Sequence, residues 1–215
     1  ELDAVLALWQ GLGYYARARN LHQAARIVVA RYGGEIPADY KALRALPGVG
    51  EYTATALLSI AFGQDYAVLD GNVRRVLCRL LDYAEGPTSA RAQRTLRAWG
   101  EALLPKGQAG AYNQAMMDLG ATVCLPREPL CGECPLQPYC LARKRGVERE
   151  RPVPLRRGPR RERSFVAAYI VRGERLLFVR RRPKGLLGGL WELPNVELQP
   201  DETDQAALMR LLEAL

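Results

Sequence analysis

Four cysteines lie close together late in the chain, at Cys124, Cys131, Cys134 and Cys140. Their spacing is C-x6-C-x2-C-x5-C, and so short a span cannot serve four separate packing roles. Thiolates are soft ligands, so the group predicts one metal centre, and the residue types suit either zinc or an iron-sulfur cluster. A disulfide pair is the alternative, which nothing in this chain favours because no secretory signal marks it. The fifth cysteine, Cys78, falls in an apolar helical pattern and is expected in the core.

The turn Leu46-Pro47-Gly48-Val49-Gly50 offers backbone chemistry rather than side-chain chemistry. It stands between two expected helices, and its glycines can expose N–H groups at a helix N-terminus. Such groups bind an anion, and a DNA phosphate is one that they can hold without reading sequence. An ordinary helix–helix turn explains the same five residues equally well.

A single carboxylate, Asp70, follows the apolar pair Val68-Leu69 and precedes Gly71-Asn72 at the expected start of a helix. Aspartate is a preferred N-cap residue, so Asp70 is expected to cap this helix. A carboxylate at that position is also available for catalysis, and the two roles are compatible.

Helical spacing dominates residues 1–141, which we expect to be all-α. Asp39 is expected to cap a short helix, and glycine pairs or Pro-Gly steps end several others. Helices are predicted at about 21–33, 39–46, 52–62, 71–81, 89–103 and 111–120, with a further one near residues 2–9.

The periodicity changes after residue 164. Two β-rich runs, 165–171 and 175–179, are joined at Arg172-Gly173-Glu174, which predicts a hairpin. Glycines at 185, 188 and 189 then precede another apolar run. An α/β domain is therefore expected over residues 164–215.

Most of the net charge of +8 is concentrated in residues 142–163, which also contain several prolines and glycines. This composition cannot bury a core, so we expect a basic linker between two domains. The linker is either a solvated tether or a strap that contacts nucleic-acid phosphates.

The overall composition excludes two classes. At 48% hydrophobic and 25% charged residues the chain is expected to be globular rather than disordered. Its longest apolar stretches, such as residues 54–62, are far shorter than a membrane span, and no leader opens it. We expect a soluble intracellular monomer, cytoplasmic and nucleoid-associated if the source is bacterial.

Together the turn, the aspartate and the four cysteines resemble the helix-hairpin-helix DNA glycosylase superfamily. The cysteine spacing equals that superfamily's cluster spacing, which implies a [4Fe-4S] cluster rather than zinc. Three further stretches are similar to the adenine DNA glycosylase branch, the MutY family: residues 9–21 (WQGLGYYARARNL), 69–73 (LDGNV) and 113–120 (NQAMMDLG). The resemblance covers nearly the whole chain and implies a helical glycosylase domain at 1–141, with its cluster loop at 124–140.

The resemblance also implies roles for single residues. Asp70 would stabilise the oxocarbenium ion that forms at the sugar when an N-glycosidic bond breaks, or act as a nucleophile toward that ion. Asn72 would orient Asp70, and Tyr52 would lie within hydrogen-bond reach of the same centre, although it could equally be a helix-face aromatic. Lyase relatives of the endonuclease III type carry a Schiff-base lysine in the hairpin. Tyr52 occupies that position here, which indicates a monofunctional glycosylase.

Two residues are expected to handle the base. Gln114 offers a donor and an acceptor that complement the N6 and N7 edge of adenine, the alternative being a buried amide in a helix contact. Tyr14, in a glycine-flanked turn, resembles the family's wedge inserted into the duplex as adenine is flipped out, the alternative being packing beside Tyr15. His22, the only histidine, is expected to be structural.

One family feature is missing. The glutamate that protonates the departing adenine would lie on a helix before Glu1, and both ends of the chain interrupt a helical pattern, as in a fragment. Neither Glu51 nor Glu101 matches the position of that acid, so this stretch alone is expected to lack it, a loss of about 10² to 10⁴ in rate.

Residues 164–215 resemble part of the family's Nudix-like domain, which recognises 8-oxoguanine opposite adenine. Glu197, Asp201, Glu202 and Asp204 lack the spacing of a magnesium-binding Nudix box, so a binding module is expected rather than a phosphohydrolase. The whole chain is thus interpreted as acting on duplex DNA with 8-oxoguanine:adenine or guanine:adenine mispairs. A non-catalytic iron-sulfur DNA-binding module is the second hypothesis.

Overall fold

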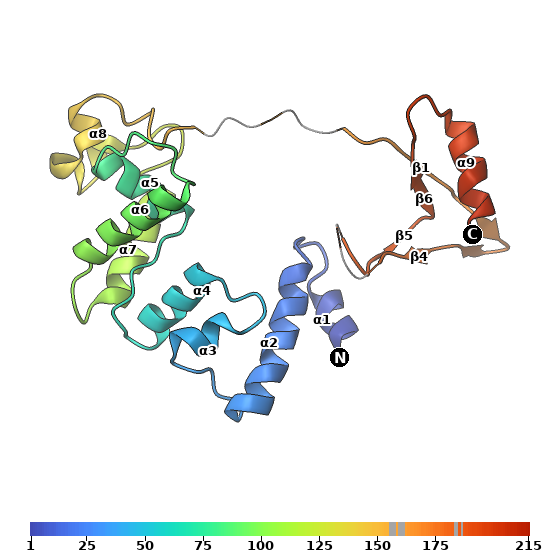
Figure 1. The fold of residues 1–215 in the computed structure, drawn as a ribbon, viewed down its shortest axis with the longest axis horizontal. Coiled ribbons are helices and arrows are strands. Elements are labelled where there is room, and N and C mark those ends of the chain that lie inside the picture. Colours follow the sequence, from blue (N-terminus) through green and yellow to red (C-terminus); the bar gives the residue numbers. More distant parts are fainter. Residues whose placement is uncertain (155–157, 159–161, 183–184, 186) are drawn as a thin grey trace. The chain divides into compact units, whose positions relative to one another are not determined.

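The computed structural model describes residues 1–154, 158, 162–182, 185 and 187–215. It divides into two compact units, one of residues Asn20–Arg156 and the other of Glu1–Arg19 together with Arg157–Leu215. The first unit is helical (Figure 1). No helix in the described ranges is long and apolar enough to cross a membrane.

The helical unit contains most of the predicted helices, close to their predicted ends. They are α2 (Ala16–Tyr32, which begins in the other unit), α3 (Tyr40–Arg44), α4 (Glu51–Ala56), α5 (Gly71–Leu80), α6 (Ala90–Leu103), α7 (Ala109–Thr122) and the short α8 (Leu141–Lys144). Two 3-10 turns, η2 (Cys131–Glu133) and η3 (Gln137–Tyr139), shape the cysteine loop.

Side-chain caps explain where several helices begin. The Asp39 carboxylate accepts a hydrogen bond from the Ala42 N–H at 2.8 Å, which confirms the predicted cap of α3. The Ser89 hydroxyl accepts from the Ala92 N–H at 3.1 Å at the start of α6. Each cap satisfies a backbone donor that the first helical turn leaves without a partner.

The predicted helix over 52–62 differs from the observed one in its second half. After α4 the chain continues as a π-helix, η1 (Leu57–Ala61). The Ser59 hydroxyl, buried here, donates to the Thr55 carbonyl at 2.8 Å, and the Thr55 hydroxyl donates to the Glu51 carbonyl at 3.0 Å. Back-bonding of this kind competes with the regular helix ladder, and π-helical turns are frequent at functional sites.

Two hydrophobic clusters hold the helical unit together. One joins α5, α6 and α7, which lie side by side in Figure 1, and it includes Cys78 as a fully buried core residue, as predicted. The other joins α2, α3, α4 and η1 around Leu43 and Leu58, both fully buried. Helices α3 and α4, which flank the Pro47–Gly50 turn, and the group α5–α7 therefore each pack on their own hydrophobic cluster.

The other unit contains α1 (Leu2–Leu8), α9 (Asp204–Glu213) and three small antiparallel pairings. The paired strands are β1 (Phe165–Ala167) with β6 (Asn195–Glu197), β2 (Val171–Arg172) with β3 (Arg175–Leu176), and β4 (Val179–Arg180) with β5 (Trp191–Glu192). The β2–β3 pair turns at Gly173, whose φ is +62°, which confirms the predicted hairpin. Its strands are shorter than predicted because β1 pairs with β6 instead.

Candidate functional site

The predicted hairpin turn joins α3 to α4. Gly48 adopts a φ of +78°, a conformation that favours glycine, and the N–H of Val49 donates to the carbonyl of Leu46 at 3.2 Å. Gly50 is the N-cap residue of α4 and provides no side-chain cap. Gly48 and Gly50 are exposed, so the turn presents backbone to solvent as the anion-seat prediction requires.

Tyr52 stands in the first turn of α4 and is 46% exposed. Its hydroxyl contacts the sulfur of Met117 on α7 at 3.8 Å. Tyr52 thus lies where the hairpin helix meets α7, partly open to solvent and not enclosed in the core.

Asp70 is the N-cap residue of α5, as the sequence predicted. Its Oδ1 accepts a hydrogen bond from the Val73 N–H at 2.7 Å, while Oδ2 has no hydrogen bond to any residue that the structure describes. The carboxylate is partly buried, and the helix N-terminus favours its negative charge. One oxygen therefore fixes the side chain and the other is available.

Asn72 is bound differently from the expectation. Its Oδ1 accepts from the Arg75 guanidinium at 2.9 Å, and no hydrogen bond to Asp70 occurs among the described residues. Arg75 also donates to the carbonyls of Gly120 (2.6 Å) and Cys124 (2.7 Å). Burial lowers the pKa of Arg75, while nearby Cys124 and Asp70 oppose that shift. Arg75 thus connects the turn that carries Asp70 to the end of α7 and to the first cysteine.

The backbones of α5 and α7 approach each other closely beside Asn72. A Cβ on Gly120 would lie 2.6 Å from the Cβ of Asn72, closer than two such atoms come in proteins. Glycine is therefore required at position 120, and it lets the end of α7 pack directly against the first turn of α5.

Asn113, which was not predicted as a functional residue, clamps α7 to the segment before Asp70. Its side chain is buried, with Oδ1 accepting from the Val68 N–H at 3.1 Å. Its Nδ2 donates to the Tyr66 carbonyl at 2.8 Å and to the Ser59 hydroxyl at 2.9 Å. The buried amide group thus has hydrogen-bond partners on both its oxygen and its nitrogen. The α7 face and the Asp70 segment therefore form one rigid region.

Gln114 follows Asn113 on α7 but points away from the core. It is exposed, and its Nε2 makes only a long contact of 3.4 Å with the Gly110 carbonyl of its own helix. The alternative of a buried amide in a helix contact is therefore wrong for Gln114. Its carboxamide is open for an external partner.

Tyr14 belongs to the other unit, in the turn between α1 and α2. It is 81% exposed and has a φ of +46°, and it directly follows Gly13, which like Gly11 also has a positive φ. An exposed aromatic in a left-handed conformation is strained and held by its neighbours. Tyr14 is too exposed for the alternative of packing beside Tyr15. The Tyr15 hydroxyl instead accepts a hydrogen bond from the Gly11 N–H at 3.3 Å.

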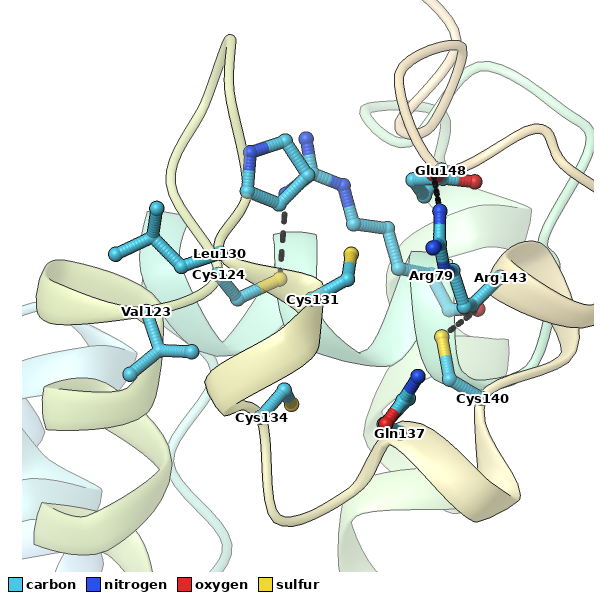
Figure 2. Close-up of a pocket in the computed structure, with 11 residues that line it drawn as sticks. Arg79, Val123, Cys124, Leu130, Cys131, Cys134, Gln137, Cys140, Arg143 and Glu148 are labelled. Carbon is cyan, nitrogen blue, oxygen red and sulfur yellow. Dashed lines mark hydrogen bonds and ion pairs between the residues drawn. The ribbon is translucent and has the colours of Figure 1, made fainter.

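The four predicted ligands, Cys124, Cys131, Cys134 and Cys140, line one cavity (Figure 2). All four are free, partly buried thiols, so the disulfide alternative is wrong. Burial raises the pKa of Cys131 and of Cys140. In the part of the chain that is described, no three Cys, His, Asp or Glu side chains are close enough to ligate one metal ion. The thiols surround a space and do not converge on one point.

The first half of the predicted linker packs onto the helical unit, which departs from the expectation of a solvated tether. Arg151 pairs with Asp82 at 2.8 Å, Arg145 pairs with the same carboxylate, and Arg143 pairs with Glu148 at 2.6 Å. These arginines are neutralised by the protein itself. Residues 155–157 and 159–161 of the linker lie outside the described residues.

Comparisons with known proteins agree with this fold. The HhH-GPD superfamily of base excision DNA repair proteins matches residues 1–102. A solved thermostable thymine-DNA glycosylase is 32% identical with a TM-score of 0.60, and the alignment covers 67% of each chain. An endonuclease III–DNA complex is 28% identical with a TM-score of 0.58, covering 68% of this chain and 67% of that one. The chain therefore belongs to the HhH-GPD superfamily.

Adenine DNA glycosylases are among the relatives of this chain, which confirms the predicted resemblance. The human protein is 38% identical over 99% of this chain and 48% of its own length. The Arabidopsis thaliana protein is 36% identical over 96% of this chain and 35% of its own length. A Buchnera aphidicola protein is 39% identical over 66% of this chain and 41% of its own length. The chain spans half or less of the length of these relatives.

Proposed function

We propose that this chain is part of a monofunctional adenine DNA glycosylase, which hydrolyses the N-glycosidic bond of adenine mispaired with 8-oxoguanine or guanine. One arrangement supports this proposal above all. The Asn113 amide joins the segment leading to Asp70 to the helix that carries Gln114, so a carboxylate for the sugar and an open carboxamide for the base share one support. The relatives named adenine DNA glycosylase match both regions.

In the proposed reaction Asp70 acts on the sugar. As the bond from C1′ to the base breaks, positive charge develops on the sugar, and the Oδ2 oxygen of Asp70 faces it. The N-cap hydrogen bond at Oδ1 holds this carboxylate in place before substrate binds. Gln114 reads the extruded adenine, and Tyr52 contacts Met117 on the same helix, α7. The acid that protonates the base is assigned to no residue of this chain.

The residue at position 52 supports hydrolysis without a lyase step. An endonuclease III relative has been solved as a trapped covalent intermediate with DNA. A covalent intermediate through an imine needs an amine, whereas the Tyr52 phenol of this chain cannot form one. The lysines Lys41, Lys106 and Lys144 lie elsewhere in the helical unit, and Lys184 lies outside the described residues.

Duplex DNA is the proposed partner, bound by one copy of the chain. The turn of Pro47, Gly48, Val49 and Gly50, in which the two glycines are exposed, would hold a phosphate. Exposed Tyr14 would enter the base stack. Because the arginines near residue 145 are paired within the protein, a DNA strap would need the later arginines of the linker.

A [4Fe-4S] cluster is the proposed occupant of the cysteine cavity. The four free thiols are soft ligands that surround a space, which suits a cluster with one thiolate on each iron better than a single zinc ion. When bound, the cluster would crosslink the loop from Cys124 to Cys140 and supply a redox-active group.

The partial Nudix-like module at 164–215 is proposed to bind the 8-oxoguanine strand and not to hydrolyse phosphates. Glu202 forms two hydrogen bonds with Arg210, at 2.9 and 2.7 Å, and this contact lowers the pKa of Glu202 to about 2. Glu197 pairs with Arg163 at 3.4 Å. Carboxylates held by arginine are poorly placed to bind magnesium.

Single-turnover adenine release from an 8-oxoguanine:adenine duplex tests the proposal. The chain is compared with a version extended at its N-terminus. Release by the longer protein without a borohydride-trapped adduct is expected. Tight mispair binding without release by either protein would favour the DNA-binding module, and a trapped adduct would favour a lyase.

A further inference from the structure

Arg79 is a buried cation in the last turn of α5. Its exposed fraction is 2%, and it heads the fully buried side chains by volume. Removing a guanidinium from water costs several kcal/mol unless hydrogen bonds and an opposite charge compensate. The partners of Arg79 therefore show which groups compensate for the burial of its charge.

Three of those partners are carbonyl groups. Arg79 donates from Nε to Arg151 (2.9 Å), from Nη1 to Leu125 (2.6 Å) and from Nη2 to Pro126 (3.0 Å). The fourth partner is the Cys124 sulfur, 3.2 Å from Nη1. The carbonyls fix the guanidinium plane, but they carry no net charge to balance it.

The nearby carboxylates are committed to other arginines. Asp82 pairs with two of them, and Glu148, which lines the cysteine cavity, pairs through Oε1 with Arg143. Within the described ranges Arg79 has no carboxylate partner. The group in contact with Arg79 that can become an anion is the Cys124 thiol, once it is deprotonated to bind a metal.

Arg79 also spans the cavity. Figure 2 shows its side chain extending from the side of Cys140 to Cys124. At one end its carbonyl accepts from the Cys140 sulfur at 3.4 Å, and at the other end its guanidinium reaches Cys124. One residue thus touches two of the four thiols, the first and the last along the chain.

We propose that Arg79 is the counter-charge of the group that the four cysteines bind, and that it raises the reduction potential of the proposed iron-sulfur cluster through its contact with Cys124. The inference rests on that proposed cluster. A positive charge and an N–H···S hydrogen bond stabilise the state with more negative charge, which is the reduced state. Because Arg79 is buried, solvent screens this effect little.

The substitution Arg79→Gln in the full chain removes the charge and keeps an amide donor. We expect the cluster to be retained and the ratio of reduced to oxidised cluster at a fixed potential to fall at least about tenfold, which is a one-electron shift of about 59 mV to lower potential. Arg79→Lys keeps the charge and is expected to restore more than half of the shift. The matched control is Arg94→Gln, the same chemical change on the exposed face of α6, which should leave the potential unchanged.

Potentiometric titration of the loaded protein, with iron content determined on the same samples, measures these values. A fully loaded Arg79→Gln protein with the wild-type potential, or with no more shift than Arg94→Gln, would overturn the proposal. No readout uses DNA, so glycosylase activity and this inference fail independently. Zinc in place of iron in the wild-type protein would overturn the inference together with its cluster.

If the Arg79 variants lose their iron, a measurement on the wild-type protein still tests the proposal. Arginine labelled with nitrogen-15 at its terminal nitrogens should give a hyperfine coupling to the cluster in its paramagnetic state, because Nη1 of Arg79 touches a ligand sulfur. Arg75 contributes no such contact, since its terminal nitrogen binds Asn72 and the Gly120 carbonyl. Absence of the coupling in iron-loaded wild-type protein would rule the proposal out.

Discussion

The Asn113 carboxamide accepts a hydrogen bond from the Val68 N–H at 3.1 Å and so joins α7 to the segment that ends at Asp70. The same amide donates to the Tyr66 carbonyl and to the Ser59 hydroxyl on the π-helical turn η1. One buried side chain therefore holds three segments that are far apart in sequence. The elements that carry Tyr52, Asp70 and Gln114 keep their spacing because of it.

Substituting Asn113→Leu should test this clamp. Leucine has a similar volume but leaves a buried N–H and a buried carbonyl without partners, so we expect a loss of about 3 kcal/mol in the free energy of unfolding. Urea denaturation measures the loss, and Gln23→Leu, at an exposed position of α2, is the matched control with little expected change. A double-mutant cycle with Ser59→Ala should show coupling between the two sites. Additive losses would mean that the amide is not part of one network.

The substitution Asp70→Asn separates catalysis from capping. Asparagine caps helices about as well as aspartate, so the free energy of unfolding should change by less than about 1 kcal/mol. The charge beside the sugar is lost, and single-turnover adenine release should fall by about 10³ or more with duplex binding retained. Asp39→Asn is the control, since Asp39 caps α3 in the same way at 2.8 Å. Near-normal release by the Asp70→Asn protein would leave Asp70 with the capping role alone.

Local rules predicted much of the helical unit. The caps at Asp39 and Asp70 depend on one side chain and the next three residues, so the sequence alone reveals them. The cysteine cavity was also predictable, because its ligands lie within one short loop. The β2–β3 hairpin followed from Gly173 between two β-rich runs.

Long-range contacts set the remaining features. Asn113 reads as an ordinary helix residue, and its partners lie on other elements. Arg79 reads as a last-turn arginine that complements the helix dipole, whereas it is buried against the cysteine loop. The π-helical turn at 57–61 has the same composition as an α-helix, so periodicity does not distinguish them. Asn72 is paired with Arg75, and the i, i+3 spacing of the two residues was the available signal.

Arg75→Gln should weaken the link between the Asp70 turn and the cysteine loop. The variant loses hydrogen bonds to Asn72, to the Gly120 carbonyl and to the Cys124 carbonyl. We expect about tenfold slower adenine release and faster iron loss to a chelator, because both ends of the link are released. Measuring the two rates on the same preparation is the test. A change in one rate without the other would show that Arg75 does not couple the two sites.

The cysteines differ in their expected roles. Cys134→Ala should remove the visible absorption and most of the iron, because it deletes a proposed ligand. Cys78→Ala should retain both and cost about 1 kcal/mol, since Cys78 is a buried core residue outside the cavity. Metal analysis and absorption spectra on matched samples distinguish the outcomes. Stoichiometric zinc in the wild-type protein, or iron loss in the Cys78→Ala protein, would contradict the assignment.

Asp82 should make the packing of the 145–151 segment depend on pH. Burial would raise the pKa of Asp82, but the hydrogen bond from Arg145 and the charge and hydrogen bond of Arg151 outweigh it, and the pKa is lowered. A carboxyl whose folded pKa is depressed adds stability above its unfolded pKa of about 3.9, and this contribution is lost as pH falls through the folded value. Wild type should therefore lose more stability than Asp82→Asn when the pH is lowered from about 5 to below 3.9. Urea midpoints across that range measure the difference, and the exposed Asp118→Asn protein should follow wild type. Equal pH dependence in wild type and Asp82→Asn would show that the arginine pairs do not stabilise the fold.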